Sequence, residues 1–295
     1  MKNYIKFNMN ESLQPKIFII ILNFNGQDVL AQCLSSVYQS DYLNFEVVVV
    51  DNNSSDGSLE QAMKSFSRVH FIKNSENFGF SKGNNVGIRW ALEKFADYVL
   101  VLNNDAVIDK AALSELVRAM QKNESAGIAS PVIFSANNSS VWFAGGNVDW
   151  HKMRAYHVYK IKSDAPYSSE YISGCAMFIK KDVFKKIGIF DERFFLYYED
   201  ADFSMRTKKA DFDLIIVPSA HIKHLEQSNK KNKLKIYWLV LSGLMFFYTY
   251  SPNKLWLFLY LRLRKIKNFC DRIFSRNENA SIVHRAYVDY GKISK

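Results

Sequence analysis

Three short polar segments follow apolar runs in the first third of the chain, and their side chains could bind a charged ligand. Asn23 and Asn25 follow the run 17–22, the segment 51–57 follows the run 45–50, and Asn103-Asn104-Asp105 follows the run 98–102. Short apolar runs that alternate with longer amphipathic stretches predict βαβ units. Ligands of such sheets lie beyond the carboxyl ends of the strands. The three segments therefore form a candidate ligand site.

The turn after the first run argues against two common chemistries. Its sequence, Asn23-Phe24-Asn25-Gly26, is neither a GxGxxG fingerprint nor a phosphate-binding P-loop. Hydride transfer and P-loop chemistry are therefore disfavoured. Asp51 and Asp56 are also ordinary turn residues after a strand. We interpret Asp51 as functional and leave Asp56 open.

Three acidic residues lie close together further along the chain. Glu199, Asp200 and Asp202 sit in the aromatic-rich segment 190–203, after Ser173-Gly174-Cys175 and before Arg206. Acids in the first turn of a helix can simply stabilise its dipole, and we expect a helix to begin near Glu199. The neighbouring aromatic residues, Tyr198 among them, suit stacking on sugar rings. This favours a catalytic role, with Arg206 free to pair with either acid.

Two further segments contain candidate ligand residues. The loop 77–85 contains Asn77, Gly79, Lys82 and Asn84, and its glycines permit close approach of the backbone to a ligand. An ordinary loop before a helix N-terminus fits it equally well. His221 and His224, three residues apart, could be surface residues or metal ligands, and sequence spacing does not decide between them.

The elements that would position these residues follow from hydrophobic periodicity. Strands are predicted at 17–22, 45–50, 69–72 and 98–102. Helices are predicted at 28–40 and at 85–95, and a further helix follows the segment 51–57 and ends at about residue 67. The hydrophobic pattern is less regular after residue 102. It predicts a helix at 111–121 and strands near 128–134 and 176–179. We expect an α/β fold with a mainly parallel, Rossmann-like sheet.

The last part of the chain has a different character. Residues 1–205 carry 21 Lys/Arg against 23 Asp/Glu, whereas residues 206–295 carry 18 against 6. The aromatic runs 236–250 and 255–261 are flanked by basic clusters at Lys230–Lys235 and Arg262–Lys267. Such amphipathic helices are typical of an anionic membrane surface, although ordinary core-packed helices remain the alternative. The sequence from residue 277 to residue 295 gives no indication of structure or function.

Cysteine usage and the N-terminus bear on the compartment. Cys33, Cys175 and Cys270 are odd in number and in no CxxC spacing, so neither a disulfide framework nor a zinc site is indicated. The polar start 1–15 does not look like an export signal. We expect a cytoplasmic protein peripherally associated with the inner face of the plasma membrane.

The polar segments, taken together and in order, resemble family 2 glycosyltransferases with the GT-A fold, over about residues 17–226. Among these the chain is most similar to rhamnosyltransferase-like enzymes of O-antigen, capsule and other surface polysaccharides. The resemblance implies an inverting, metal-dependent transfer from a UDP- or dTDP-linked sugar to a hydroxyl of a glycan or lipid-linked saccharide. It also implies a GT-A domain at 1–228, with a nucleotide-sugar half at about 16–110 and an acceptor half at about 111–228. A basic, aromatic, membrane-associating region would occupy 229–295.

The resemblance also implies roles for individual residues. Asp51 would accept hydrogen bonds from the pyrimidine ring, and further nucleotide contacts would come from a group of polar residues: Asn23, Asn25, Asn77, Gly79, Lys82, Asn84 and Asn104. Asn103-Asn104-Asp105 would be the counterpart of the DxD metal motif, with Asn103 in place of its first carboxylate. Asp105 and His224 would then hold Mn²⁺ or Mg²⁺, because a hard cation neutralises the departing diphosphate.

On the acceptor side, the resemblance implies that Asp200 is the general base that deprotonates the acceptor hydroxyl. Glu199, Asp202, Tyr198 and Gly174 would contact or position the acceptor. Three alternatives remain: an inert nucleotide- or carbohydrate-binding module, a nucleotidyltransferase on a similar sheet, and a nucleic-acid-binding protein that uses the basic tail. No stacking platform for nucleic acid is evident, so we expect no nucleic-acid partner.

Overall fold

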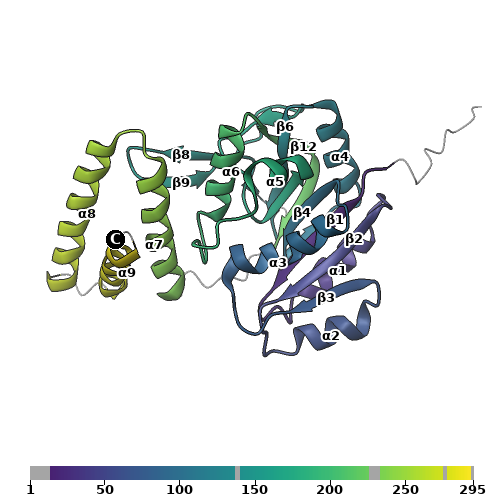
Figure 1. The fold of residues 1–295 in the computed structure, drawn as a ribbon, viewed down its shortest axis with the longest axis horizontal. Helices are drawn as coiled ribbons and strands as arrows, with labels where there is room; N and C mark the ends of the chain where they lie inside the picture. Colours follow the sequence, from purple (N-terminus) through teal and green to yellow (C-terminus); the bar gives the residue numbers. More distant parts are fainter. Residues whose placement is uncertain (1–13, 137–139, 226–232, 275–277, 294–295) are drawn as a thin grey trace, which may run out of the picture.

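The protein is described here by a computed structural model covering residues 14–136, 140–225, 233–274 and 278–293. A mixed sheet forms the centre of the larger part of the molecule, with helices on its faces, and three C-terminal helices form a group at one end (Figure 1). The strands in the main sheet follow the order β10-β12-β6-β11-β4-β1-β2-β3. In addition, β5 pairs with β12 and β7 pairs with β6, while β8 and β9 form a separate two-stranded sheet.

The first half of the sheet is parallel, as the alternating pattern predicts. It consists of β1 (Ile17–Asn23), β2 (Phe45–Asp51), β3 (Val69–Lys73) and β4 (Tyr98–Asn103). The connecting helices are α1 (Leu30–Tyr38), α2 (Ser58–Ser65) and α3 (Gly79–Glu93). In the register, Asn23 lies beside Asp51 and Leu22 lies beside Asn103. The polar strand ends therefore meet at one sheet edge, as expected.

The second half mixes parallel and antiparallel pairs. Here β11 (Ala176–Lys180) runs antiparallel to both β4 and β6 (Ala126–Ser135), and the long β12 (Asp213–His224) pairs parallel with β6. The short strand β5 (Ala106–Ile108) pairs antiparallel with the end of β12. The remaining strands are β7 (Val141–Phe143), β8 (Gly146–Asp149), β9 (Arg154–His157) and β10 (Tyr167–Ser168). The helices of this half are α4 (Ala112–Lys122), α5 (Lys181–Ile187) and α6 (Glu199–Lys209).

One predicted boundary is wrong by about one and a half turns. The helix expected at 85–95 begins at Gly79, so most of the expected loop 77–85 belongs to α3. The Asn77 side chain accepts a hydrogen bond from the Gly79 N–H at 2.9 Å, and the Phe80 N–H donates to the Phe195 carbonyl at 2.7 Å. These contacts satisfy N–H groups that a helix start leaves open. The Phe195 carbonyl belongs to a distant segment of the chain. The local sequence does not contain this contact, and by itself it therefore predicts a loop.

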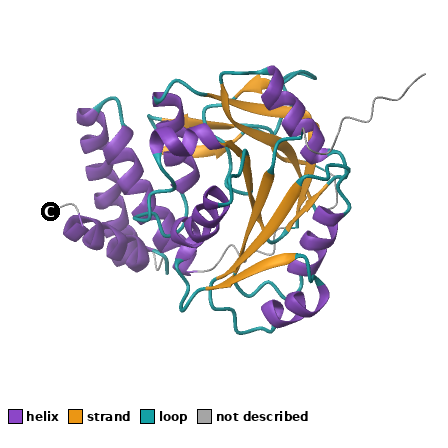
Figure 2. Ribbon diagram, turned by 45° about the vertical axis from the view of Figure 1, so that its right-hand side comes forward, coloured by secondary structure: helices purple, strands orange, loops and turns teal. Residues whose placement is uncertain are grey.

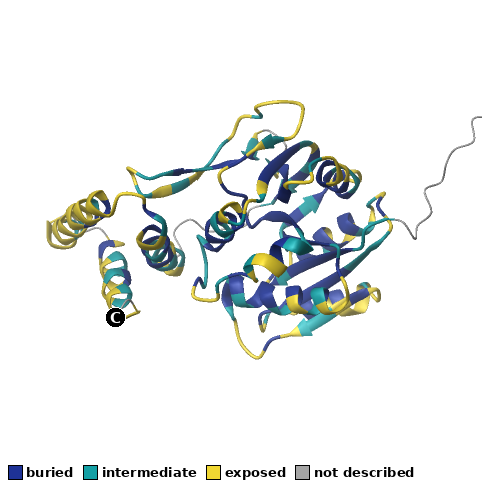
Figure 3. Ribbon diagram, turned by 45° about the horizontal axis from the view of Figure 1, so that its top comes forward, coloured by how far each residue is buried: buried dark blue, intermediate teal, exposed yellow. Residues whose placement is uncertain are grey.

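The C-terminal group consists of α7 (Lys233–Tyr250), α8 (Lys254–Phe274) and α9 (Ala280–Ile293). Helix α9 falls in the segment for which the sequence indicated nothing. In Figure 2 the three helices lie together beside the body of the molecule, and in Figure 3 most of α8 is exposed. The predicted boundary near 228 and the lysines Lys230 and Lys231 lie outside the described residues, as do residues 1–13.

The two long C-terminal helices bury different amounts of surface. Helix α7 packs Leu241, Leu244, Phe246 and Phe247 into the protein, so the core-packed alternative describes this face of it. Helix α8 buries only Leu257 and Leu261. No helix in the described part of the chain combines the length and apolar character required to cross a bilayer.

Candidate active site

Asn23 and Asp51 form a buried hydrogen-bonded pair at the ends of β1 and β2. The Asn23 side-chain amide donates to Asp51 Oδ1 at 2.8 Å and to the hydroxyl of Ser58 at 2.9 Å. Asp51 also accepts from the Ser54 N–H at 2.9 Å and from the Ser54 hydroxyl at 2.6 Å. Both side chains are fully buried. The pair therefore fixes the shape of the loop 51–58, in addition to any contact that it makes with a ligand.

Asn104 joins this network from the loop after β4. Its amide donates to Asn23 Oδ1 at 2.9 Å, which links the ends of β1 and β4. Gly26 lies against the same contact, because a Cβ atom at Gly26 would lie 2.4 Å from Asn104 Nδ2 and 2.5 Å from Asn23 Oδ1. The structure thus places Asn23, Asn104 and Asp51 in one connected network, whereas Asn25 is exposed at its rim and binds the Ser55 N–H through its side chain.

Asn52 is a positioning residue that the sequence reasoning did not single out. Its amide donates to Asn77 Oδ1 at 3.1 Å and to the Gly79 carbonyl at 3.0 Å, and its oxygen accepts from Asn74 at 2.8 Å. It therefore holds the start of α3 against the end of β2. Its place directly after Asp51 in a strand-end loop was the available signal.

The residues predicted in the segment 77–85 have different surroundings. Asn77 is exposed, and Gly79 is buried with φ of +72°, a region that favours glycine. Lys82 is partly exposed, with Nζ 3.6 Å from the centroid of the Phe78 ring. Asn84 is fully buried and donates to the Phe80 carbonyl at 3.0 Å, while its own oxygen has no hydrogen-bond partner. Asn77 lies just before α3, and the other three residues occupy its first turns.

Asp105 and His224 are brought together by strand pairing. In the antiparallel ladder of β5 and β12, His224 lies opposite Ala106, the neighbour of Asp105. The Leu225 N–H also donates to the Asp105 carbonyl at 2.8 Å. As a result, His224 Nε2 lies 3.1 Å from Asp105 Oδ1. His221, by contrast, points its ring nitrogens to the Pro218 carbonyl and Asp109.

The Asp105 and His224 pair fits a divalent cation. Two neighbouring ligands of an octahedral ion at about 2.1 Å would lie about 3 Å apart, which matches the observed separation. Asp105 Oδ1 is buried and, apart from its contact with His224 Nε2, makes no hydrogen bond within the described residues, so it can act as a ligand. Among the described residues, no group of three or more His, Cys, Asp or Glu side chains gathers to hold an ion. Further ligands would have to be diphosphate oxygens and water, as is usual for Mg²⁺.

Asp200 occupies the first turn of α6 and is held by two backbone donors. Its Oδ2 accepts from the Gly174 N–H at 3.0 Å, and its Oδ1 accepts from the Ala201 N–H at 2.7 Å. Burial raises the pKa of Asp200, and these hydrogen bonds oppose the rise. A carboxylate with a raised pKa is a stronger base than an ordinary aspartate. A Cβ at Gly174 would lie 2.9 Å from the Phe80 ring, so only glycine leaves this contact undisturbed.

Glu199 is buried beside Asp200. Its Oε2 has no hydrogen-bond partner, and burial together with the charge of Asp200 raises its pKa well above the usual range. Of the two neighbours, Glu199 therefore holds its proton more tightly. This leaves the negative charge on Asp200.

Asp202 belongs to a different network from Asp200. Arg206 Nε donates to Asp202 Oδ2 at 2.9 Å, and the Tyr250 hydroxyl donates to Asp202 Oδ1 at 2.7 Å. Arg206 also donates to the carbonyls of Ile187 and Ile189. Since Asp202 is buried with both oxygens bonded inside the protein, its geometry suits positioning of α6 more than direct contact with an acceptor.

The aromatic residues before α6 mainly pack against the protein. Phe194 is buried, Phe195 stacks on Trp238 of α7 with centroids 4.4 Å apart, and Tyr198 packs against Phe246. Tyr198 adopts φ of +65°, which is unusual for a non-glycine residue. Such strained residues are concentrated at functional sites. Here the strain sits at the residue that precedes α6.

Adjacent residues connect the donor-side loops to the α6 side. The Asn103 N–H donates to the Cys175 carbonyl at 2.9 Å, directly after Gly174, which binds Asp200. The Asn85 amide donates to the Phe190 carbonyl at 2.9 Å. The two sets of predicted residues thus form one continuous site. A nucleophile activated by Asp200 and a diphosphate neutralised near Asp105 are compatible with it.

The profile of "Glycosyl transferase family 2" matches residues 18–188. This range holds the donor-side loops and ends before α6.

Individual relatives are similar over most of their length. The dTDP-rhamnosyl transferase RfbF of Shigella flexneri is 26% identical over 212 residues, which are 72% of this chain and 70% of the relative. The low-salt glycan biosynthesis hexosyltransferase Agl10 of Haloferax volcanii is 27% identical over 236 residues, with coverage of 78% and 74%. The N-acetylglucosaminyl-diphospho-decaprenol L-rhamnosyltransferase of Mycobacterium tuberculosis is 25% identical over 231 residues, with coverage of 70% and 75%.

Solved structures share the fold. GalNAc-T7 with UDP, GalNAc and Mn²⁺ has a TM-score of 0.63 at 17% identity, over 77% of this chain but only 47% of that chain. The mannosyltransferase PcManGT from Pyrobaculum calidifontis, in complex with GDP-Man and Mn²⁺, has a TM-score of 0.60 at 15% identity, over 94% and 74%. The predicted GT-A fold is confirmed by these similarities.

Proposed function

Because this chain belongs to glycosyl transferase family 2, we propose that it moves a sugar, with inversion, from a UDP- or dTDP-linked donor to a hydroxyl of a glycan or lipid-linked saccharide. It is a glycosyltransferase of glycan biosynthesis, and its relatives include rhamnosyltransferases, a hexosyltransferase of glycan biosynthesis and an O-antigen biosynthesis protein. The rhamnosyl group is our preferred donor sugar, since it occurs in the names of several relatives.

One observation carries the mechanism: the loops after β1, β2 and β4 meet at one sheet edge, next to the base helix α6. Asn23 bonds Asp51 and Asn104 at this edge, and the Gly174–Cys175 turn links it to Asp200. This arrangement supports a reaction between two bound substrates. An inert binding module would not need a carboxylate whose pKa is raised beside the nucleotide loops.

On the donor side, we assign nucleotide contacts to Asp51 and Asn25. Asn23 and Asn104 also hold the loops in place, because the Asn23 amide donates to Asp51 and the Asn104 amide donates to Asn23. Lys82, Gly79, Asn77 and Asn84, at the start of α3, are assigned to the diphosphate or the sugar. The cation of Lys82 and the N-terminus of the helix both favour an anion there.

We assign Asp105 and His224 as the protein ligands of a divalent cation, Mn²⁺ or Mg²⁺. When bound, such an ion neutralises the charge that develops on the departing diphosphate. Asp105 supplies a buried carboxylate oxygen without a hydrogen bond, and His224 supplies Nε2 next to it. The ring of His224 packs edge-on against Trp142, with centroids 4.4 Å apart, which fixes its orientation.

On the acceptor side, Asp200 takes the proton of the attacking hydroxyl. The Gly174 and Ala201 N–H groups hold its carboxylate in one orientation. Burial and the charge of Asp200 raise the pKa of Glu199, which favours the neutral form of Glu199 beside the charged base. Inversion follows because one base on one face of the sugar permits a single displacement.

We also propose that the protein associates peripherally with the inner face of the plasma membrane through α8. Five exposed apolar residues of this helix are spaced three, four or seven positions apart and thus share one face: Leu255, Leu259, Leu263, Ile266 and Ile273. Arg262, Lys265 and Arg272 border that face. A helix that presents apolar and basic residues outward is suited to anionic lipid.

The first test measures release of nucleoside diphosphate from UDP-, dTDP- and GDP-sugars, with Mn²⁺ or EDTA, and with lipid extract as acceptor. We expect one donor to be consumed in a metal-dependent reaction. The Asp200→Asn variant should lose the reaction by a factor of about 10² to 10⁴ while still binding nucleoside diphosphate. Asp164→Asn, which changes an exposed aspartate, is the control. Equal activity in Asp200→Asn would contradict the assignment of the base, and failure to bind any nucleotide would contradict the function.

A further inference from the structure

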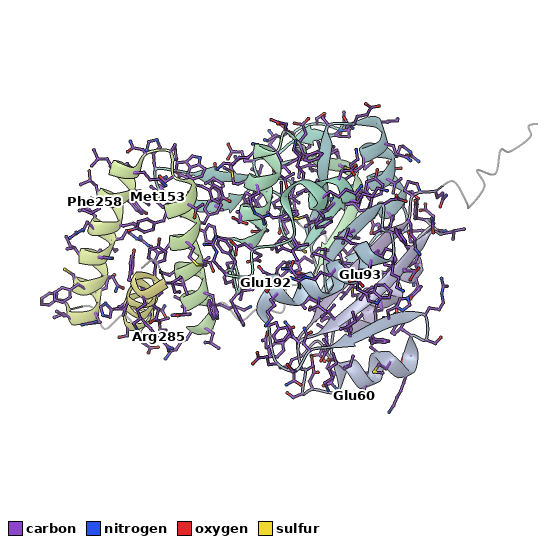
Figure 4. All side chains as sticks on the ribbon, in the orientation of Figure 1. Glu60, Glu93, Met153, Glu192, Phe258 and Arg285 are labelled. Atoms are coloured by element: carbon purple, nitrogen blue, oxygen red, sulfur yellow. The ribbon has the colours of Figure 1, made fainter. Side chains whose placement is uncertain are left out.

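A cavity of about 490 Å³ lies outside the site described so far. It is bounded by the turn and second strand of the β8–β9 hairpin and by the facing sides of α7, α8 and α9. We call it the hairpin cavity. Figure 4 labels Met153, which lines it, at the gap between α7 and α8, and Phe258 on the opposite, outer side of α8. Its volume is typical of small-molecule sites.

The lining of the hairpin cavity combines an apolar wall with cations. Leu244 and Phe247 of α7 and Leu261 of α8 are buried and supply the wall. Lys152, Arg154 and Arg264 supply positive charge, and no acidic residue is among the described residues that line it. Arg154 has one weak acidic neighbour, Asp149, at 3.9 Å. A ligand that matches this lining has an anionic group joined to an apolar chain.

Arginine pairs favour one type of anion. Guanidinium groups bind phosphate oxygens through two parallel hydrogen bonds, and Arg154 and Arg264 approach the cavity from two separate elements, β9 and α8. A diphosphate has enough oxygens to engage both. A simple alcohol or fatty chain carries no charge to match these cations, which are exposed in the structure.

The hairpin cavity is connected to the base helix through Tyr198. This residue lines the cavity and immediately precedes Glu199 and Asp200 in α6. Burial raises the pKa of Tyr198 to about 12, and a backbone hydrogen bond from Ala155 opposes the rise. Its phenol is therefore neutral and oriented. A Cβ at Gly243 of α7 would lie only 3.2 Å from the Tyr198 ring, so the helix and this side chain are in close contact.

The position of α8 is fixed on the hairpin by two aromatic donors. The Tyr260 hydroxyl donates to the Lys152 carbonyl at 2.9 Å, and Trp256 Nε1 donates to the His151 carbonyl at 3.1 Å. The opposite face of α8 carries the exposed apolar residues described above. A chain that leaves the cavity therefore emerges beside the surface that we assign to the membrane.

From this lining we propose that the hairpin cavity binds the diphosphate and the first part of the apolar chain of a lipid-linked acceptor, which places the attached saccharide at Asp200. The proposal rests on the glycosyltransferase function and narrows its acceptor from any glycan to a lipid diphosphate. Arg154 and Arg264 hold the diphosphate, the α7 and α8 side chains hold the chain, and Tyr198 forms the boundary with the reaction centre.

The test uses the full-length protein and farnesyl diphosphate as a probe, with binding measured by calorimetry below its aggregation concentration. Inorganic pyrophosphate and farnesol are measured separately, to distinguish the anion from the chain. We expect farnesyl diphosphate to bind at least about tenfold more tightly than either fragment. The Arg264→Ala variant should weaken its binding by about tenfold, the effect of one charge-assisted hydrogen bond. Arg262→Ala, two residues away on the same helix and outside the cavity lining, should not.

Three results would overturn the proposal. The first is that pyrophosphate binds as tightly as farnesyl diphosphate, and the second is that farnesol does. The third is that the Arg262→Ala and Arg264→Ala variants weaken the binding of farnesyl diphosphate equally. A Val240→Trp variant, which fills the cavity from α7, gives an independent check. It should abolish probe binding while the protein keeps a cooperative thermal transition, and retained probe binding in this variant would also contradict the proposal.

The donor reaction separates this proposal from the general function. Binding of UDP or dTDP in the presence of Mn²⁺ is measured on the same wild-type preparation. If nucleotide binds but the binding of farnesyl diphosphate does not depend on Arg264, the cavity assignment fails and the function stands. If the binding of farnesyl diphosphate depends on Arg264 but no nucleotide binds and no donor is consumed, the glycosyltransferase mechanism fails independently of the cavity.

Discussion

Asp105 Oδ1 lies 3.1 Å from Nε2 of His224, although Asp105 lies in the loop after β4 and His224 lies far along the chain, at the end of β12. The contact depends on the pairing of β5 with β12, which sets His224 opposite Ala106. Two ligands at this separation can share one cation. The resemblance of Asn103-Asn104-Asp105 to a DxD motif implied Asp105 as a ligand, whereas the spacing of His221 and His224 did not by itself select His224.

Replacing His224 therefore tests the metal assignment. In the His224→Ala variant, we expect the enhancement of nucleoside diphosphate binding by Mn²⁺ to be at least about tenfold smaller than in the wild type. Mutation of residues that merely support a metal ligand already lowers metal affinity by about 10- to 100-fold. Titration of nucleotide binding against Mn²⁺ measures this without turnover. His221→Ala is the matched control, since His221 contacts Pro218 and Asp109 instead. Equal effects of both variants would refute the assignment.

The raised pKa of Asp200 predicts the acid side of the pH profile. The base must be deprotonated, so kcat/KM should fall as the pH decreases through the pKa of Asp200 in the folded protein. Because burial raises that pKa, the fall should begin above the ordinary value of about 3.9 for aspartate. Rates between pH 4 and pH 8, at saturating Mn²⁺, measure it. A flat profile down to pH 4 would exclude Asp200 as the titrating base.

Glu199 makes a prediction about stability. Its folded-state pKa is raised by burial and by Asp200, so the native state binds more protons than the unfolded state between the two pKa values. Its contribution to stability is complete below the unfolded value of about 4.3 and is lost as the pH rises through the folded value. Glu199→Gln should flatten this decrease in the free energy of unfolding. Thermal unfolding from pH 4 to pH 8 measures it, and Glu60→Gln, an exposed residue of α2, is the control. A decrease that persists unchanged would show that Glu199 does not cause it.

Gly79 should be sensitive to substitution for two separate reasons. Its φ is +72°, and an added Cβ would lie 2.4 Å from the Phe195 carbonyl oxygen. We expect Gly79→Ala to lower the free energy of unfolding by more than the roughly 1–2 kcal/mol of left-handed strain alone. Gly57→Ala is the matched control, because Gly57 has φ of +81° but no neighbour within 4 Å of the added atom. Denaturant titration compares them, and equal losses would mean that the Phe195 contact has no cost.

The membrane assignment predicts a specific effect on α8. The double variant Leu259→Ser, Leu263→Ser removes two exposed apolar side chains on the outward face, so binding to vesicles that contain anionic lipid should weaken clearly. Thermal unfolding should not change, because both side chains are exposed. Phe95→Ser, an exposed residue of the opposite half that is 86% accessible, is the control. Unchanged vesicle binding in the double variant would exclude this face.

Much of the nucleotide half follows from the sequence alone. The runs at β1, β2 and β4 are Val- and Ile-rich because both faces of these strands are buried, so burial appears as continuous hydrophobicity. Polar residues directly after such runs must lie at the carboxyl edge of a parallel sheet. This is why Asn23, Asp51 and Asp105 could be placed near one another without coordinates. The start of α6 near Glu199 was likewise predictable from the local segment.

The rest was decided by contacts between distant segments. The pairing of β5 with β12 brings His224, rather than His221, next to Asp105. Arg206 pairs with Asp202 rather than with Asp200, because the carbonyls of Ile187 and Ile189 orient its guanidinium. The sequence also left open which C-terminal helix is buried. Helix α7 packs on the aromatic residues before α6, and α8 keeps an apolar face outward. Local periodicity describes which residues share a face, whereas the partner of that face depends on register and packing over long separations in the chain.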